Sequence, residues 1–360
     1  MSWLEDGRHR AWLRARPASV AAERTGPPID LSRNENPWGP SPRAVEAARR
    51  ALSGAHRYPD GSLLARLAQH LGVPEPRVLL GSGSSEIIGL IVQALCGPGD
   101  EVLAPARSFA CYRMSCEAHR RAFREAAGGP AFSCDVDGLL AAAGARTAVV
   151  FLANPNNPTG TYVGRSAFER LVDGLPAHVT LAVDEAYLEY AEALDYPDAL
   201  QYLGRRERLI SLRTFSKVYG LAGLRVGYAV GPEPLIASLH RARLPFTVNA
   251  VGQAAAGAAL EDTEHVQRSR QVNSVERRRL EATLRSMGAD FVPSQTNFLM
   301  VRPPGPGREG QRVSQALLRS GVRVQPLEDH YGLPFHLRIT VGTPSDNAHL
   351  LSALRGVLGD

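Results

Sequence analysis

Short apolar runs alternate with polar, glycine-rich turns and helical segments between about residues 77 and 230. The centres of these runs are continuously apolar, which is typical of strands that are buried on both faces of a sheet. Helical segments between them, such as Ser85–Cys96 and Ser166–Gly174, indicate an α/β fold with a largely parallel sheet. The predicted strands are Arg77–Leu80, Glu101–Ala104, Ala148–Ala153, Val179–Val183, Leu209–Leu212 and Arg225–Val230.

The pattern changes after Pro245. A long Ala- and Arg-rich helical stretch extends from about Asn249 to Met287. Two further strands are predicted after it, and each leads into a helix, which indicates a smaller α+β unit. The strands are Asn297–Val301 and His336–Val341, and the helices are Glu309–Leu318 and Asp346–Leu358.

The N-terminal segment has a character of its own. Up to about Asp30, Trp3, Leu4, Trp12 and Leu13 recur at helical spacing, which predicts a short arm that docks on a partner. After a turn-rich loop, Ser41 and Pro42 predict the start of a helix as N-cap and first-turn proline, and Gly54 predicts its end. We therefore expect an arm with part of the small domain in residues 1–45, a large domain in 46–248 and a small domain in 249–360.

Composition and charge exclude several functional classes. The 360 residues are 44% hydrophobic and 21% charged, as in an ordinary folded protein with a large core. The formal charge of +5 comes without a basic stripe interleaved with aromatics, so we expect no nucleic acid as a partner. The four cysteines form no C-x-x-C pair, and no histidine cluster has zinc-ligand spacing. There is no signal-peptide core and no bilayer-length apolar run, so we expect a cytoplasmic protein without a membrane partner.

Two charged residues follow buried strands and are candidates for chemistry. Asp184 ends the run Val179–Val183, where a carboxylate is costly unless it pairs with a cation and where open α/β sheets bind ligands. It could be a helix N-cap, or it could keep a pyridine nitrogen protonated. Lys217 follows the run Leu209–Leu212. It could be a surface charge, or it could be a buried amine whose lowered pKa allows it to attack a carbonyl carbon.

Two turns after strands are also distinctive. The sequence Gly81-Ser82-Gly83-Ser84-Ser85 leads from a strand into a helix, so free backbone N–H groups could bind an anion or simply be capped. It lacks the lysine of a P-loop and the third glycine of a dinucleotide fingerprint, which disfavours ATP and NAD. The sequence Asn154-Pro155-Asn156-Asn157-Pro158-Thr159-Gly160 has ordinary turn chemistry but is the most distinctive string in the chain.

Taken in order, these strings resemble the pyridoxal-5'-phosphate (PLP) aminotransferases of the aspartate aminotransferase fold, which is fold type I. The string 154–160, then Asp184–Tyr187, then Ser216–Lys217 with residues 222–228 carry this resemblance. Further strings are similar to the histidinol-phosphate aminotransferase family, and together they cover nearly the whole chain from about Leu31. These strings are residues 33–37 and 39–42, 57–60, 296–298 and 337–342.

The resemblance implies a role for each matching residue. Lys217 would hold PLP as a Schiff base and then move a proton between the substrate Cα and the cofactor, Asp184 would pair with the pyridine nitrogen, and Tyr187 would bond the ring oxygen. Phe109 would stack on the ring, with Tyr112 close enough to be confused with it. The implied cofactor-binding residues are Gly83, Ser84, Ser85, Phe109, Asn157, Asp184, Tyr187, Thr214, Ser216, Lys217 and Arg225, with Tyr58 reaching the neighbouring subunit. The implied substrate-binding residues are Arg338, for the α-carboxylate, and Asn36, Asn157 and Tyr58.

The resemblance also implies an activity and an assembly. The fold is expected to be α/β, PLP-dependent transferase fold type I, with a mostly parallel central sheet in a large domain and a smaller α+β domain. The protein would be a homodimer with shared active sites that transfers an amino group from a small-molecule donor to a 2-oxo acid. The leading donor is histidinol phosphate, with 2-oxoglutarate as acceptor.

Two departures from the family pattern bear on the donor. The arm reads Arg16-Pro17-Ala18-Ser19 and has no tyrosine before Tyr58, and Gln325 stands where the family usually has arginine. Arg323 lies on the same strand face and, with Arg14 and Arg16, is a candidate to replace the missing charge. The loss of a charge-assisted contact costs about 1.5–3 kcal/mol.

Three alternatives remain. The donor could be an aromatic or secondary-metabolite amine. The chain could be a lyase similar to threonine-phosphate decarboxylase, although that group tends to have Thr-Lys and Pro-Gly-Leu-Arg where this chain has Ser216-Lys217 and Ala222-Gly223-Leu224-Arg225. The fold also occurs in transcription regulators, but these need a winged-helix domain, and the arm before Asp30 is too short to form one.

Overall fold

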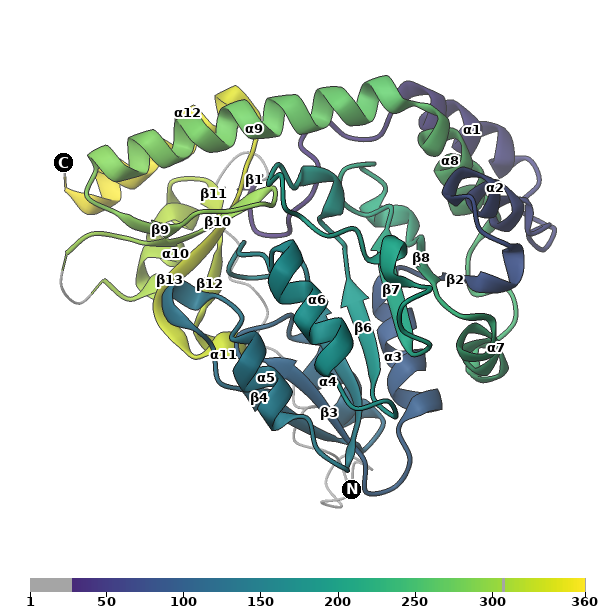
Figure 1. The fold of residues 1–360 in the computed structure, drawn as a ribbon. Coiled ribbons are helices and arrows are strands. Elements are labelled where there is room, and N and C mark those ends of the chain that lie inside the picture. The colour runs from purple at the N-terminus through teal and green to yellow at the C-terminus, as the bar shows by residue number, and fades with distance from the viewer. Residues whose placement is uncertain (1–27, 306–307, 360) are drawn as a thin grey trace, which may run out of the picture.

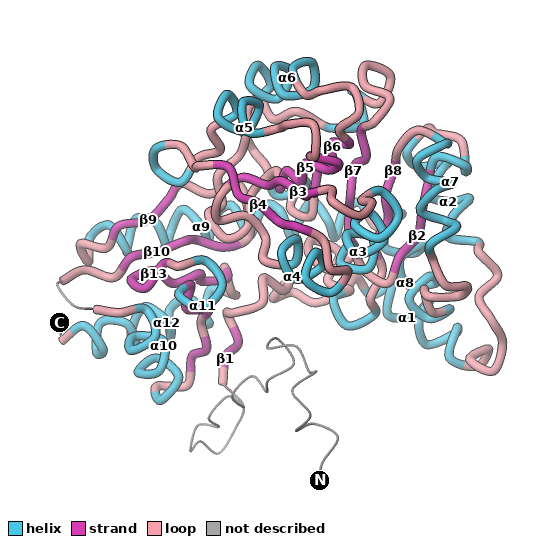
Figure 2. The backbone as a smooth tube through the Cα atoms, turned by 90° about the horizontal axis from the view of Figure 1, so that it is seen from below, coloured by secondary structure: helices cyan, strands magenta, loops and turns pink. Residues whose placement is uncertain are grey.

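A computed structural model describes residues 28–305 and 308–359 (Figure 1). The arm residues Trp3, Leu4, Trp12 and Leu13, the predicted docking segment, lie outside the described residues. Within the described part, one sheet has seven strands, a second has four and a third has two. The larger and smaller sheets occupy different ends of the molecule, as the backbone view in Figure 2 also shows.

The seven-stranded sheet has the order β2-β8-β7-β6-β5-β3-β4. Strand β8 is antiparallel to both of its neighbours, and the remaining strands run parallel to one another. The mostly parallel sheet predicted from the apolar runs is therefore confirmed. The strands are β2 (Val78–Gly81), β3 (Glu101–Pro105), β4 (Ala122–Ala126), β5 (Thr147–Ala153), β6 (Thr180–Asp184), β7 (Leu209–Thr214) and β8 (Gly227–Val230).

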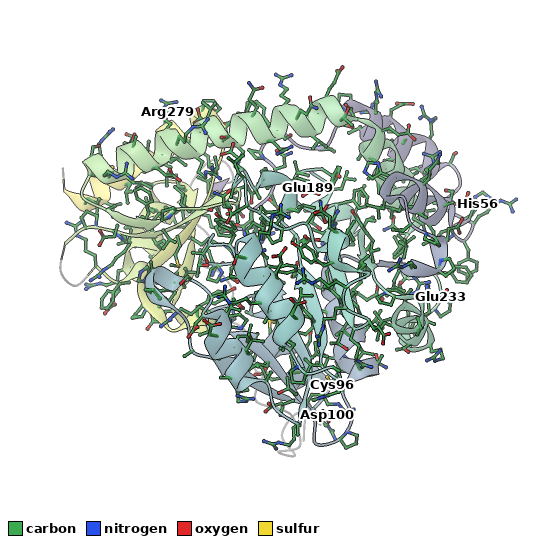
Figure 3. All side chains as sticks on the ribbon, in the orientation of Figure 1. His56, Cys96, Asp100, Glu189, Glu233 and Arg279 are labelled. Atoms are coloured by element: carbon green, nitrogen blue, oxygen red, sulfur yellow. The ribbon has the colours of Figure 1, made fainter. Side chains whose placement is uncertain are left out.

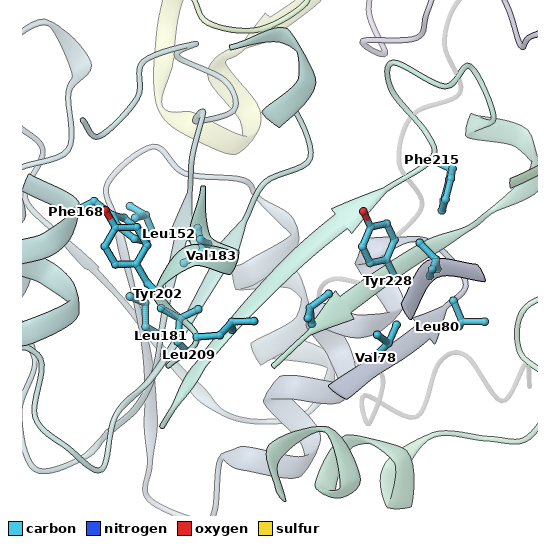
Figure 4. Close-up of a cluster of buried hydrophobic side chains, with 14 of the residues drawn as sticks. Val78, Leu80, Leu152, Phe168, Leu181, Val183, Tyr202, Leu209, Phe215 and Tyr228 are labelled. Atoms are coloured by element: carbon cyan, nitrogen blue, oxygen red, sulfur yellow. The ribbon is translucent and has the colours of Figure 1, made fainter. Parts of the chain in front are cut away.

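Two hydrophobic cores lie on opposite faces of this sheet. Successive residues of a strand point to opposite faces, so Val78 and Leu80 join one core while Leu79 joins the other. Figure 4 shows the first core, in which Phe168 and Tyr202 pack edge to face with ring centroids 5.0 Å apart. Its helices are α1 (Pro42–Leu52), α2 (Ser62–Leu71), α5 (Val136–Ala142), α6 (Arg165–Gly174) and α8 (Ala250–Glu261), and those of the second core are α3 (Ser84–Leu95), α4 (Cys111–Ala118) and α7 (Glu233–Ala242).

The smaller part is built around the antiparallel sheet β12-β13-β10-β9, and beside it β1 pairs with β11 in parallel. Its own core contains Leu299, Leu317 and Leu350. The strands are β1 (Ile29–Asp30), β9 (Asp290–Val292), β10 (Phe298–Arg302), β11 (Val322–Arg323), β12 (Gln325–Leu327) and β13 (Leu333–Thr340). The helices are α10 (Gly310–Arg319), α11 (Glu328–Tyr331) and α12 (Pro344–Leu358).

The predicted helical stretch from Asn249 to Met287 is two helices, because Asp262 ends α8 and caps α9 (Thr263–Ser286) by accepting from the backbone of His265. Helix α9 extends along one side of the molecule, from the end that holds α8 to the smaller sheet (Figure 1). Helix α8 packs on α1 and α2 and shares the first core. We therefore propose a domain boundary near Asp262 in place of the predicted 249.

Solvent-facing arginines line the outside of α9. Arg279, labelled in Figure 3, points away from the body of the protein, and its side chain is 53% exposed.

In the part of the chain that the structure describes, we find no helix with the length and apolar character needed to span a membrane. Short 3-10 helices complete the fold at Glu75–Arg77, Pro130–Phe132, Leu188–Tyr190, Ala199–Tyr202 and Ala222–Leu224.

Candidate active site

A cavity of about 500 Å³ opens at the carboxyl ends of the parallel strands. Strands β2, β3, β5, β6 and β7 run in one direction, so the loops that follow them meet at one edge of the sheet. Strand β13 and the loop after β1 close the cavity from the smaller part of the molecule. The predicted site residues that line it are Ser84, Ser85, Phe109, Asn157, Asp184, Tyr187, Thr214, Ser216, Lys217, Arg225 and Arg338.

Lys217 follows β7 and places its amine in this cavity. Its Nζ donates to the backbone oxygen of Arg33 at 3.1 Å and lies 5.6 Å from the centre of the Tyr187 ring. Burial lowers the pKa of Lys217 from 10.5 to about 7, and the positive charges of Arg338 and Arg225 act in the same direction. An amine with this pKa is partly neutral near pH 7 and is therefore available as a nucleophile or a base.

Lys217 is also the only lysine in the 360-residue sequence. All other residues among the 41 Lys and Arg are arginines, which stay protonated at any physiological pH. The one side-chain amine of the chain thus stands inside the cavity.

Asp184 ends β6 and is only 4% exposed. The hydroxyl of Tyr112 donates to its Oδ2 at 3.0 Å, and the backbone N–H of Ala186 donates to its Oδ1 at 3.2 Å. Burial raises the pKa of Asp184 to about 6, although both hydrogen bonds and the charge of Lys217 oppose that shift. Because both donors are neutral groups, a cationic partner inside the cavity would stabilise this carboxylate further.

Polar side chains from distant segments meet around the hydroxyl of Tyr187. It accepts from Nδ2 of Asn34 at 2.8 Å and from Nδ2 of Asn157 at 3.4 Å. The Oδ1 of Asn157 in turn accepts from Arg338 at 2.6 Å, and Arg338 also donates to the backbone oxygen of Ser32 at 2.7 Å. The Nε of Arg338 has no partner among the described residues, so this buried guanidinium retains donor capacity for a ligand.

The loop before α3 forms a cradle for an anion. Helix α3 begins at Ser84, and no side chain caps its N-terminus. Gly83 has a φ of +76°, which favours glycine, and a Cβ on it would lie 2.4 Å from Nη2 of Arg225 and displace this guanidinium. The hydroxyls of Thr214 and Ser216 also line the cavity and are 2.9 Å apart.

Three predicted residues do not line the cavity. Gly83 lies behind the cradle, against Arg225. Tyr58 is 77% exposed and stacks on Phe246, with ring centroids 4.3 Å apart. Asn36 lies outside the cavity wall, and its Nδ2 donates to the backbone oxygen of Val218 and to the hydroxyl of Ser269, so its predicted contact with the substrate stays a prediction.

Sequence reasoning missed three residues at the site. Arg33 and Asn34 line the cavity. Tyr112 does not line it, but its hydroxyl donates to Asp184, which does. Of Phe109 and Tyr112, the two aromatic residues near the predicted stacking position, it is Phe109 that lines the cavity. One feature of the sequence could have identified the site, because Lys217 is the only lysine and therefore the only side chain that could form a Schiff base.

The cavity fits the cofactor that the resemblance implies. Its uncapped helix N-terminus, paired hydroxyls and Arg225 suit a phosphate group. The buried carboxylate of Asp184 suits a protonated ring nitrogen, and Phe109 offers an aromatic face. A half-buried amine with a pKa of about 7 suits attachment to an aldehyde. The residues present thus match the phosphate, the ring nitrogen and the reactive carbon of PLP.

Comparisons with known proteins agree with this geometry. The sequence model of the family described as aminotransferase class I and II matches residues 27–354. The chain is 45% identical to histidinol-phosphate aminotransferase 2 of Methylococcus capsulatus, over 92% of this chain and 90% of that one. It is 43% identical to histidinol-phosphate aminotransferase of Akkermansia muciniphila, with the same coverage. The crystal structure of the Sinorhizobium meliloti enzyme of that name, in complex with PLP, is similar with a TM-score of 0.86 and 27% identity, and the match covers 92% of this chain and 91% of that one.

Proposed function

Because the chain belongs to the class I and II aminotransferase family, we propose that it transfers the amino group of histidinol phosphate to 2-oxoglutarate with PLP as its cofactor. One observation carries the proposal: Lys217, Asp184 and Arg338 meet in a single cavity at the carboxyl edge of the sheet. The identity of 43–45% to relatives named histidinol-phosphate aminotransferase supports histidinol phosphate as the amino donor.

Each residue of the cavity would have a separate role in amino transfer. When bound, PLP supplies an electron sink for the negative charge that develops on the substrate Cα. The N-terminus of α3 and Arg225 would hold its phosphate, and Asp184 would hold a proton on its ring nitrogen. Lys217, with a pKa of about 7, is suited to take the proton from the substrate Cα and to return one after the amino group has moved.

Arg338 is the cation that would bind the substrate's anionic group. Its guanidinium is buried and is oriented by Asn157 and Ser32, so it loses little entropy when it binds a carboxylate or a phosphate. Gln325 lies opposite Arg338 across the β12–β13 pair and also lines the cavity. The position next to Arg338 is therefore neutral in this chain.

A second cation, besides Arg338, is needed to bind the phosphate of the donor, and the positions of Arg323 and Arg33 differ in this respect. Arg323 pairs with Asp30 at 3.4 Å and does not line the cavity. Arg33 does line it, its side chain is 67% exposed, and its own contact with Asp30 is a longer 3.8 Å. Arg33 is therefore better placed than Arg323 to meet the phosphate of the donor. The other two candidates, Arg14 and Arg16, lie outside the described residues.

An exposed aromatic surface supports the proposed homodimer. Tyr58 and Phe246 stack on each other although both are exposed, and the exposed Leu244 is close in sequence. Exposed aromatic and apolar residues that gather in this way often mark an interface. We propose that Tyr58 reaches the active site of a second copy of the chain, and that the pair buries about 2,000–5,000 Å² in total.

A cytoplasmic location is part of the same proposal, since all four cysteines are unpaired, as is usual in cytosolic proteins.

The donor is tested by comparing kcat/KM for histidinol phosphate with kcat/KM for histidinol. Two charge-assisted contacts to the phosphate predict a preference of at least about a hundredfold for the phosphorylated donor. Gln325→Arg should increase this preference. A preference near one would show that the donor is not histidinol phosphate, and the donor would then be sought among unphosphorylated amines.

The second cation is tested with a matched pair of substitutions. Arg33→Gln should reduce kcat/KM for histidinol phosphate by about tenfold and leave histidinol unaffected, since one charge-assisted contact is removed. Arg323→Gln is the control, because Arg323 also contacts Asp30 but lies outside the cavity wall. Equal effects of the two substitutions would contradict the role of Arg33.

A further inference from the structure

We propose that Tyr112 is a positioning residue of this active site, whose hydroxyl orients the carboxylate of Asp184 and keeps it ionised so that it can pair with a cationic ring nitrogen. The proposal rests on the function proposed above. Tyr112 does not line the cavity and acts only through Asp184.

The geometry holds the Tyr112 hydroxyl in one place. Tyr112 lies on α4 and is fully buried. Its ring stacks on Phe151 of β5, with centroids 4.5 Å apart and planes 5° apart, and it packs edge-on against Phe109 with centroids 5.8 Å apart. With the ring fixed between two aromatic side chains, the hydroxyl is directed at Oδ2 of Asp184, 3.0 Å away.

Two donors from different segments fix the plane of the Asp184 carboxylate. Tyr112 bonds Oδ2 and the backbone N–H of Ala186 bonds Oδ1, so neither oxygen is free to rotate away. A hydrogen bond to an ionised acceptor in a buried site is stronger than a neutral one and costs more to lose. Removal of the hydroxyl would therefore leave one buried carboxylate oxygen without its donor.

The hydroxyl also opposes the effect of burial on Asp184. Burial raises the pKa of Asp184 to about 6, and the hydrogen bond from Tyr112 is the largest influence that lowers it. Glu185, which follows Asp184 directly, raises the pKa of Asp184 and Lys217 lowers it, while the partly buried thiol of Cys111 and the phenol of Tyr187 interact electrostatically with the same carboxylate. Burial and the nearby Asp184 raise the pKa of Tyr112 well above its usual value, so Tyr112 stays protonated and remains a donor.

A consequence follows for the proton that Asp184 shares with the ring nitrogen. With the Tyr112 hydroxyl present, the carboxylate is stabilised as an anion and the proton stays on the nitrogen. Without it, the carboxylate becomes more basic, and the proton shifts toward Asp184. The ring nitrogen then carries less positive charge, which weakens its ability to accept electrons from the substrate Cα.

The test compares Tyr112→Phe with a matched control, Tyr202→Phe. The substitution of Tyr112 removes one oxygen atom and keeps the ring stacked on Phe151. Tyr202 is also buried, and its hydroxyl donates to Glu169 at the same distance of 3.0 Å, but it lies in the core under α6 and not at the cavity. Thermal unfolding of both proteins establishes that each is folded.

The main readout is the ¹⁵N chemical shift of the ring nitrogen in holoenzyme loaded with ¹⁵N-labelled PLP. In Tyr112→Phe we expect this shift to move toward the value of an unprotonated pyridine, and kcat to fall by about ten- to a hundredfold, as for the loss of one charge-assisted bond. Tyr202→Phe should match the wild type in both measurements.

The outcomes separate this proposal from the one on which it rests. A wild type that fails to bind PLP, or whose ring nitrogen is unprotonated, overturns the proposed function of the site. A wild type with a protonated ring nitrogen, together with a Tyr112→Phe variant of unchanged ¹⁵N shift, overturns the role of Tyr112 alone. A loss of kcat in both variants without a change in shift also overturns it, because the effect would then be one of packing.

Discussion

Replacement of Lys217 by methionine should stabilise the protein without cofactor, and the gain should depend on pH. The pKa of Lys217 in the folded state is about 7, whereas an unfolded lysine titrates near 10.5. Between these values the unfolded chain binds a proton that the folded chain does not. Stability therefore rises with pH in this window, and the penalty for burying the amine is fully present below pH 7.

The size of the effect follows from the same shift. A drop from 10.5 to about 7 corresponds to at most about 5 kcal/mol, at about 1.4 kcal/mol for each pKa unit. Lys217 keeps some contact with solvent, which reduces this figure. We expect Lys217→Met to be more stable than the wild type by about 2–4 kcal/mol at pH 6, with the difference vanishing by about pH 10.5.

Guanidinium unfolding of both apoproteins from pH 6 to pH 10, at one protein concentration, measures this difference. Titrating groups away from the cavity are shared by the two proteins and cancel when the two free energies of unfolding are subtracted. Asp184 is the exception, because the charge of Lys217 lowers its pKa, so the pH dependence is read above pH 7, where Asp184 is ionised in both proteins. A difference that stays constant with pH would refute the lowered pKa of Lys217. So would a wild type that is the more stable protein at pH 6.

Three further predictions concern the site and its assembly. Asp184→Ala should leave the ring nitrogen of PLP unpaired and slow removal of the substrate Cα proton by orders of magnitude in single-turnover measurements; near-normal turnover would contradict its role. Gly227→Ala should weaken PLP binding at least tenfold in equilibrium dialysis, because the added Cβ would lie 2.5 Å from the backbone nitrogen of Ser84 and push the anion cradle apart, and unchanged affinity would show that the cradle is adaptable. Mixing inactive Tyr58 and Lys217 variants should restore part of the activity through hybrid dimers, whereas full activity of a verified monomer would rule out shared sites.

Strands buried on both faces could be predicted from the sequence because their apolar runs are continuous, as in Val149 to Leu152. Strand β4 was missed because it is an edge strand in which the charged residues Arg124 and Glu125 interrupt the apolar pattern, so it carries no such run. The break between α8 and α9 was missed because Asp262 ends one helix and caps the next without any glycine or proline to mark the boundary.

Several residues of the cavity wall were predictable because they lie in strings that follow a strand, such as Ser84 after β2, Asn157 after β5 and Lys217 after β7. Tyr112 and Asn34 were not, because their partners Asp184 and Tyr187 lie 72 and 153 residues further along the chain. The position of Asn36 outside the cavity wall was unpredictable for a related reason. The string Asn34-Glu35-Asn36 does not show which amide faces the cavity, and only the turn of the loop decides it.

Because the chain has a single lysine, the amine in the cavity can be observed in solution separately from all other side chains. If the protein is produced with ¹⁵N only in its lysine side chain, the spectrum contains one amine signal, and that signal belongs to Lys217. Its titration would be read without assignment and without mutation. Reagents that modify amines would likewise meet one side chain in the whole chain, so the extent of labelling at Lys217, mapped separately from labelling of the α-amino group, would report on how accessible the cavity is.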